Sequence, residues 1–204
     1  MQGIYGGRKP LSRAFRNRFI EISIPDLPHS EIQEIVVQSC GLAPKYGAIL
    51  VNIMKELQIL RHANLFLGKH GAVTTRDIIK CGKRQPNSMT EVANQAYMLL
   101  AEKLRQDEEK HMVETVIAGV CNMRIDVFNL YDSQDELQNL QQSLRSGGIH
   151  AEGVTRIGIT RQLRRIWSLL SSCLDHNEPG LLVGETSSGK TTACQLYAAT
   201  RGLP

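Results

Sequence analysis

The sequence predicts a mainly α-helical protein with short α/β portions near its two ends. Through the middle of the chain, apolar residues recur three and four positions apart, which is the spacing of one helix face. Residues 19–25 (FIEISIP) alternate apolar and polar side chains, as in a half-buried strand. Near the other end, the short apolar run from Leu181 to Val183 precedes a glycine-bounded loop and a further helical stretch. Strand, loop and helix in that order predict the start of a phosphate-binding α/β core.

Helical spacing, caps and stops define the elements between the two ends. Gly41 is placed to end a first helix, and Thr74 can cap a short one further along. Ser88, with Glu91 three residues later, forms a capping-box pattern that predicts a long helix, with residues 107–109 (DEE) as its solvated end. The predicted helices cover residues 30–40, 45–61, 75–84, 88–110, 135–145, 159–176 and 190–200, and residues 111–130 are helix-like.

Two features organise the second half of the chain. Glycines at positions 147, 148 and 153 make the clearest linker, so we expect a domain boundary near residue 150. Trp167 lies in the helix that follows this linker, and we expect it to be a core residue.

Composition limits the classes of function. Hydrophobic residues make up 42% of the 204 residues and charged residues 22%, as in a folded protein. The chain has no run of about 18 apolar residues and no signal-peptide pattern, so we expect an intracellular, non-membrane protein. Its five cysteines are widely spaced, which indicates neither a zinc site nor a disulfide framework. A net charge of +4 is interleaved with 20 acidic residues, and nucleic-acid binding is not indicated.

The most specific motif is GETSSGKT, which fits G-x-x-x-x-G-K-[ST] at every fixed position. Its two glycines let the backbone curl, so that N–H groups converge on phosphate oxygens at a helix N-terminus. Lys190 would reach the β and γ phosphates of ATP, Thr191 would offer its hydroxyl to Mg²⁺, and Thr192 would approach the α phosphate. The predicted nucleotide-binding residues are Gly184, Glu185, Thr186, Ser187, Ser188, Gly189, Lys190, Thr191 and Thr192.

Hydrolysis requires more than this loop. It also needs an acidic Mg²⁺ partner on a neighbouring strand, called Walker B, and a group that orients the attacking water. About a dozen residues follow Thr192, and we do not expect an upstream acid such as Asp126 or Asp132 to complete the site. The isolated chain is therefore expected to hold half a nucleotide site and to be inactive as an ATPase.

Arginines supply the remaining candidates. Residues 13–19 (RAFRNRF) place closely spaced arginines just before the predicted strand, which suits an arginine finger that reaches a neighbour's γ-phosphate. Arg18 is the favoured finger, with Arg16 beside it, and the alternative is a solvated basic loop. Arg76 lies near the start of a short helix, where on its own it is a surface arginine paired with Asp77 or another acid.

These three stretches together resemble the midasin family, the giant dynein-related AAA+ ATPases of large ribosomal subunit maturation. The order is GGRKPLSRAFRNRF before the first strand, TTRDIIKCGKR in the helical segment, and EPGLLVGETSSGKTTACQLYA after the linker. The resemblance covers nearly the whole chain. It implies a junction of two tandem modules: residues 1–24 are the C-terminal end of an AAA+ α/β core, 25–150 its helical lid, and 151–204 the N-terminal start of the next module.

The resemblance also implies roles and partners. Arg18, with Arg16, would be the finger that acts on the neighbouring module's nucleotide, and Arg76 falls on the sensor-2 arginine of the lid. ATP and Mg²⁺ would be the cofactors. The implied partners are neighbouring AAA+ modules of the same polypeptide, and pre-60S ribosomal particles from which assembly factors are removed during maturation and nuclear export, in the nucleolus and nucleoplasm.

Departures from the family pattern are small. GETSSGKT replaces the usual GETGTGKT, and Cys81 stands where a bulky aromatic residue is common, which affects packing. Two alternatives stay open. One is another dynein-related or MoxR-type AAA+ chaperone ATPase, and the other is a truncated, non-enzymatic helical interaction protein whose loop no longer binds nucleotide.

Overall fold

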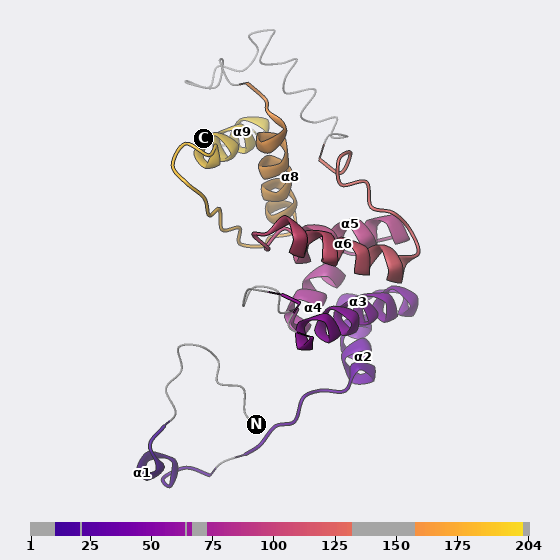
Figure 1. The fold of residues 1–204 in the computed structure, drawn as a ribbon, viewed down its shortest axis with the longest axis vertical. Coiled ribbons are helices and arrows are strands. Elements are labelled where there is room, and N and C mark those ends of the chain that lie inside the picture. The colour runs from indigo at the N-terminus through magenta and orange to yellow at the C-terminus, as the bar shows by residue number, and fades with distance from the viewer. Residues whose placement is uncertain (1–10, 21, 64, 67–72, 132–157, 202–204) are drawn as a thin grey trace.

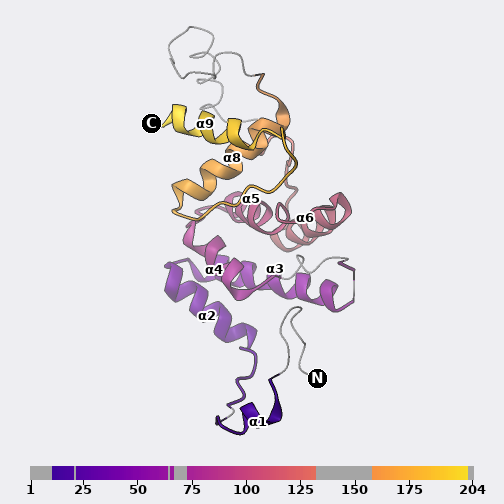
Figure 2. The same cartoon turned by 90° about the vertical axis from the view of Figure 1, so that its left-hand side faces the viewer.

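The computed structural model describes residues 11–20, 22–63, 65–66, 73–131 and 158–201. The helices stack along the long axis of the molecule, with α1 at one end and the α8–α9 pair at the other (Figures 1 and 2). The prediction of a mainly α-helical protein is confirmed. In chain order the helices are α1 (Arg13–Arg16), α2 (His29–Cys40), α3 (Pro44–His62), α4 (Thr75–Lys83), α5 (Met89–Leu100), α6 (Asp107–Cys121), α8 (Arg161–Asp175) and α9 (Lys190–Thr200).

Helices α2 to α6 form one bundle around a continuous apolar core. The central helix is α3, against which α2, α4, α5 and α6 all pack. Along α3, Leu50, Ile53, Met54 and Leu57 recur at helical spacing and are at most 1% exposed. Each such side chain contributes roughly 1.5–3 kcal/mol by leaving water. This core fixes the ends of α4 and α5, which carry the polar residues described below.

The helix ends follow the predicted local signals. Gly41 ends α2 in the left-handed conformation, with φ 64°, which glycine adopts without strain. At α4, the Thr74 hydroxyl accepts from the Asp77 backbone N–H at 3.3 Å, and the Asp77 carboxylate accepts from the Thr74 N–H at 2.9 Å. At α5, the Ser88 hydroxyl accepts from the Glu91 N–H at 3.1 Å. These caps begin the helices at the predicted positions.

The predicted long helix over residues 88–110 is wrong, because two helices occupy that stretch. Helix α5 ends at Leu100, a turn follows, and α6 begins at Asp107. Leu104 in the turn is 3% exposed, so the turn itself packs into the core. Residues 107–109 begin α6, where their acidic side chains face the positive end of its dipole.

The two predicted strands are also wrong within the described residues. Residues 22–28 and 181–183 are irregular. Ile22, Ile24 and Leu181 are 81%, 86% and 87% exposed. A strand satisfies its backbone N–H and C=O groups by pairing with a neighbouring strand, and the described part of the chain supplies none for either segment. The helix predicted after the loop does form, as α9.

Helices α8 and α9 pack as a pair with a small apolar core of their own. Leu163 and Trp167 of α8 contact Ala193 and Leu196 of α9, and all four are at most 6% exposed. Trp167, at 1% exposure, is the predicted core residue. The predicted helix over residues 135–145 and the linker glycines lie outside the described residues. Among the described helices, none has the length and apolar character needed to cross a membrane.

Candidate nucleotide site

The loop from Gly184 to Gly189 joins an irregular segment to the N-terminus of α9. Ser187 and Gly189 have positive φ angles of 63° and 87°, so the backbone turns tightly before the helix. A Cβ added at Gly184 would lie 3.1 Å from the Ser188 hydroxyl oxygen, which shows how closely the loop folds on itself. The first helical hydrogen bond of α9 runs from the Ala193 N–H to the Gly189 carbonyl at 2.9 Å.

Lys190 lies over this loop. Its Nζ donates to the carbonyl oxygens of Gly184 at 3.0 Å and Glu185 at 2.5 Å, and to the Ser188 hydroxyl at 3.1 Å. The ammonium therefore lies close to the first turn of α9, whose unpaired N–H groups carry partial positive charge. Both charges favour an anion at the same place, which is the chemistry of a phosphate site.

The other loop residues surround that position with hydroxyl groups. Thr186, Ser187 and Thr191 are exposed, and Thr192 is half-buried in the first turn of α9. Hydroxyl oxygens can accept a bond from water or coordinate a hard cation. Within the described residues, no cluster of three or more histidine, cysteine or acidic side chains is placed to hold a metal ion.

The predicted arginines lie away from the loop. Arg16 ends α1 and Arg18 follows it, and both are exposed. Figures 1 and 2 show α1 at the opposite end of the molecule from α9. Arg76 is exposed in the first turn of α4, within the bundle. The structure thus does not bring these arginines to the loop of this chain, and their finger and sensor roles stay predictions.

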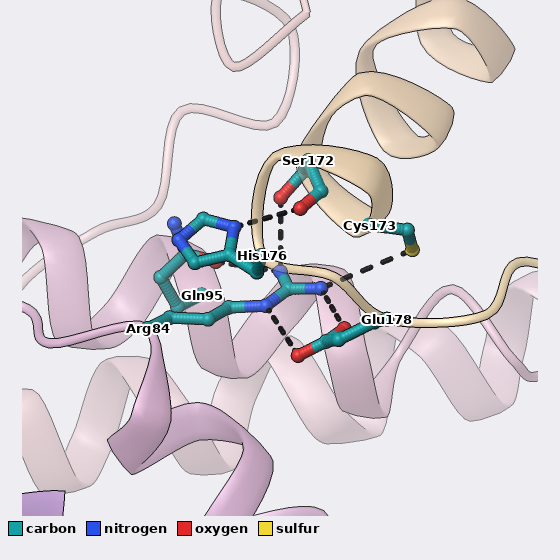
Figure 3. Close-up of polar contacts among 6 residues, drawn as sticks. All are labelled: Arg84, Gln95, Ser172, Cys173, His176 and Glu178. Atoms are coloured by element: carbon teal, nitrogen blue, oxygen red, sulfur yellow. Dashed lines mark hydrogen bonds and ion pairs between the residues drawn. The ribbon is translucent and has the colours of Figure 1, made fainter.

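A polar cluster joins the bundle to α8, and Arg84 is at its centre (Figure 3). Arg84 caps the C-terminus of α4, and its side chain is 1% exposed. It donates from Nε and Nη2 to the two carboxylate oxygens of Glu178, at 3.2 and 2.6 Å. Nη1 donates to Gln95 of α5 at 2.7 Å and to the Ser172 hydroxyl at 3.0 Å. Nη2 also lies 3.9 Å from the Cys173 sulfur. This buried bidentate pair links the bundle to the segment after α8.

A second pair crosses the same boundary with the charges exchanged. Glu102, after α5, accepts from Nε of Arg165 in α8 at 3.0 Å, from Nη2 of the same side chain, and from the Tyr131 hydroxyl at 2.5 Å. Burial alone raises the pKa of Glu102, but the hydrogen bonds from Arg165 and Tyr131 outweigh it, so this pKa lies below its ordinary value. Nearby, the Arg161 guanidinium lies 4.3 Å from the centre of the Phe128 ring.

Comparison with known families matches residues 31–124 to the midasin AAA lid domain. The midasin of Dictyostelium discoideum is 45% identical over 203 residues, which cover 96% of this chain and 3% of that protein. The chain belongs to the midasin family. The midasin of Giardia intestinalis is 29% identical over 215 residues, which cover 97% of the chain and 4% of that protein. The chain therefore spans a small part of the length of these relatives.

The midasin lid match covers α2 to α6 apart from the first residues of α2. A lid is one part of an AAA+ module, so the match indicates further AAA modules in the same polypeptide. Arg76, Arg84 and Glu102 all lie inside the matched range, whereas the loop and α8 lie after it. The Arg84–Glu178 and Glu102–Arg165 pairs therefore join the midasin lid to the segment that carries the loop.

Sequence reasoning missed Arg84, Glu178, Glu102 and Arg165. The sequence GKR at the end of α4 looks like an ordinary helix C-terminus, where basic side chains interact favourably with the partial negative charge of the helix dipole. One signal was available in α8, where Arg161, Arg165, Ser168 and Ser172 recur at helical spacing opposite the apolar stripe. A helix that is apolar on one face and regularly polar on another can have two packing partners.

Proposed function

We propose that this chain is part of a midasin-like AAA+ mechanoenzyme that binds ATP and Mg²⁺ at Gly184 to Thr192. The observation that carries the proposal is the Lys190 ammonium held over a glycine-bounded loop at the N-terminus of α9. The family supports the choice of AAA+ chemistry over that of an unrelated nucleotide-binding protein. Bound ATP would supply the phosphoryl chemistry, and Mg²⁺ would neutralise its charge.

The residues present fit the phosphates of a nucleotide. Lys190 would exchange bonds to its own loop for bonds to the β and γ phosphates. Thr191, exposed on the first turn of α9, would direct its hydroxyl to Mg²⁺, and Thr192 lies next to it for the α phosphate. The helix N-terminus adds N–H donors that need no movement to meet an anion. These groups bind and orient, and they supply no base for hydrolysis.

The arginines complete the proposal in the assembled protein. Arg18, with Arg16, acts as the finger on a neighbouring module's nucleotide, and Arg76 acts as sensor 2 for the nucleotide of its own module. ATP-driven movement between modules then remodels pre-60S ribosomal particles and removes assembly factors in the nucleolus and nucleoplasm. The isolated chain binds ATP without hydrolysing it, because the Walker B acid and the water-orienting group lie elsewhere.

Titration of the chain with a fluorescent ATP analogue in the presence of Mg²⁺ tests the loop. Lys190→Ala removes a charge-assisted hydrogen bond to phosphate, worth about 1.5–3 kcal/mol, so the affinity should fall about 10- to 150-fold. Lys45→Ala is the matched control. Lys45 is also a lysine in the first turn of a helix, α3; it is exposed, and its removal should leave the affinity unchanged.

Two outcomes would contradict the proposal. Nucleotide binding that survives Lys190→Ala would remove the loop from the site. Mg²⁺-dependent ATP hydrolysis by the isolated chain, abolished by Lys190→Ala, would show that the chain holds a complete catalytic site. Phosphate release measured over hours on the same samples distinguishes binding from turnover.

A further inference from the structure

Arg84 crosses the boundary between the lid and the segment that leads into the phosphate loop. Its backbone caps α4, but its side chain reaches the C-terminal end of α8 (Figure 3). Of its partners, Gln95 belongs to the lid, whereas Ser172, Cys173 and Glu178 belong to α8 and the residues after it. A guanidinium is planar and its donors point in fixed directions, so this set of acceptors constrains both sides of the boundary.

Glu178 lies where the chain leaves α8 and turns toward the loop. Helix α8 ends at Asp175, Asn177 has a positive φ of 54°, and the Glu178 N–H donates to the Cys173 carbonyl at 2.8 Å. Residues 179–183, which follow, are irregular and lead directly to Gly184. The bidentate bond from Arg84 therefore lies at the start of a stretch, residues 179–183, that forms neither helix nor strand.

The second ion pair holds α8 itself and defines its direction. On the lid, Arg84 and Glu102 carry opposite charges, and they meet Glu178 and Arg165 respectively. Docking α8 in the reverse direction would bring like charges together in a partly buried interface, which is strongly unfavourable. The two pairs thus have separable positions: Arg165 lies in the helix, and Glu178 lies at the exit toward the loop.

We propose that Arg84 is a positioning residue for the phosphate loop. Through Glu178 it sets where residues 179–183 begin, and hence where Gly184 lies relative to the lid. A rotation of the lid is transmitted to the loop through this buried guanidinium, while the Glu102–Arg165 pair keeps α8 docked. The positioning stands on the contacts alone, and its consequence for nucleotide affinity rests on the function proposed above.

Two distances measured by pulsed electron paramagnetic resonance separate the loop from the helix pair. Asn52→Cys places one spin label on the exposed side of α3. In one sample the second label is on Glu185→Cys in the loop, and Cys194→Ser removes the exposed thiol of α9. In the other sample the second label is on the natural Cys194. Cys173→Ser removes the half-buried thiol in all samples and retains a polar acceptor near Arg84.

Arg84→Met should broaden the 52–185 distance distribution and leave the 52–194 distribution at its wild-type width, because α8 stays docked. Arg165→Met is the matched control and should broaden both distributions. An Arg84→Met variant that broadens both distributions, or neither, would overturn the proposal. Where Arg84→Met fails to fold by circular dichroism, Glu178→Gln keeps the side-chain volume, weakens the same bond, and must show the same selective broadening.

Nucleotide affinity supplies the second measurement. If about a tenth of the loops remain in the binding geometry, Arg84→Met weakens binding of a fluorescent ADP analogue with Mg²⁺ about tenfold. Unchanged affinity in Arg84→Met would overturn this consequence. A wild-type chain that binds no analogue would overturn the proposed function instead, and the distance measurements would still decide the role of Arg84.

Discussion

The Glu102–Arg165 pair offers the sharpest test of how the lid holds α8. We consider Arg165→Met, Glu102→Gln and the double variant, which together form a double-mutant cycle. Methionine keeps most of the length of the arginine stem, and glutamine keeps the shape of the carboxylate. Arg165→Met therefore removes the charge and all of the side-chain donors, and Glu102→Gln removes the charge and one of the two oxygen acceptors, while both changes leave the packing of the boundary largely intact.

The expected magnitude follows from what remains when one partner is removed. Breaking a buried ion pair costs about 3–5 kcal/mol because the other charge stays buried without its partner. Here the Arg165 side chain is 26% exposed, and Glu102 keeps the Tyr131 hydroxyl at 2.5 Å and the Lys110 ammonium at 3.9 Å. We therefore expect Arg165→Met to destabilise by about 2–3 kcal/mol, with a coupling energy of about 1–2 kcal/mol in the cycle.

Tryptophan fluorescence during urea unfolding is the assay. Trp167 is the one tryptophan of the sequence, and it is buried in α8 next to this boundary. Its emission therefore follows the undocking and unfolding of α8. A coupling energy below about 0.5 kcal/mol would refute the reasoning, because the pair would then contribute no more than an exposed surface ion pair.

Other predictions concern pH and the lid core. The Glu102 pKa lies below its ordinary value of 4.5, so the stability that it contributes is complete above about pH 4.5 and is lost as the pH falls through the lowered pKa. Unfolding followed between about pH 6 and pH 3 should show this loss, and Glu102→Gln should remove it. Gly47→Ala should destabilise by about 1–3 kcal/mol in urea, because the added methyl would lie 2.4 Å from Val37 Cγ2. Gly119→Ala, also within a helix but facing open space, should stabilise by about 0.5–1 kcal/mol. Equal changes in the free energy of unfolding for the two variants would contradict both predictions. Thr74→Val should cost about 1 kcal/mol by removing the hydroxyl that caps α4, and an unchanged urea midpoint would contradict this.

Local signals explain why most helix positions were predictable. Gly41, Thr74 and Ser88 act on backbone groups within a few residues, so the sequence next to them is sufficient to place a helix end. The division between α5 and α6 was not predictable in this way. It depends on Leu104 entering the core, which is a tertiary contact, and the capping pattern at Ser88 indicates where a helix begins but not where it ends. The strand predictions failed for a related reason. Alternation of apolar and polar residues shows which face a segment would bury, but not whether a partner strand is present.

The residues of the candidate site also differ in whether a local sequence signal or a tertiary contact determines their role. The loop from Gly184 to Gly189 is contiguous in sequence, so its motif could be found there, and its role in binding phosphate stays a prediction. Arg84 and Glu178 are 94 residues apart, and no short motif connects them. Only the docking of α8 buries the guanidinium and gives it acceptors. Residues whose role depends on an interface are therefore recognised from the assembled structure, whereas residues whose role depends on a loop are recognised from the sequence.

The position of α8 between two neighbours has a consequence for how its sequence can vary. From Leu163 to Cys173 no side chain is exposed, because one side meets α9 and the other meets the lid. Helix α2, by contrast, keeps exposed positions such as Glu34 and Gln38 one turn apart. A library of all single substitutions should therefore show tolerant positions recurring every three or four residues in α2 and a continuous intolerant run in α8. Neutral drift in α8 then requires paired changes, so the lid and the loop-bearing segment are expected to diversify together.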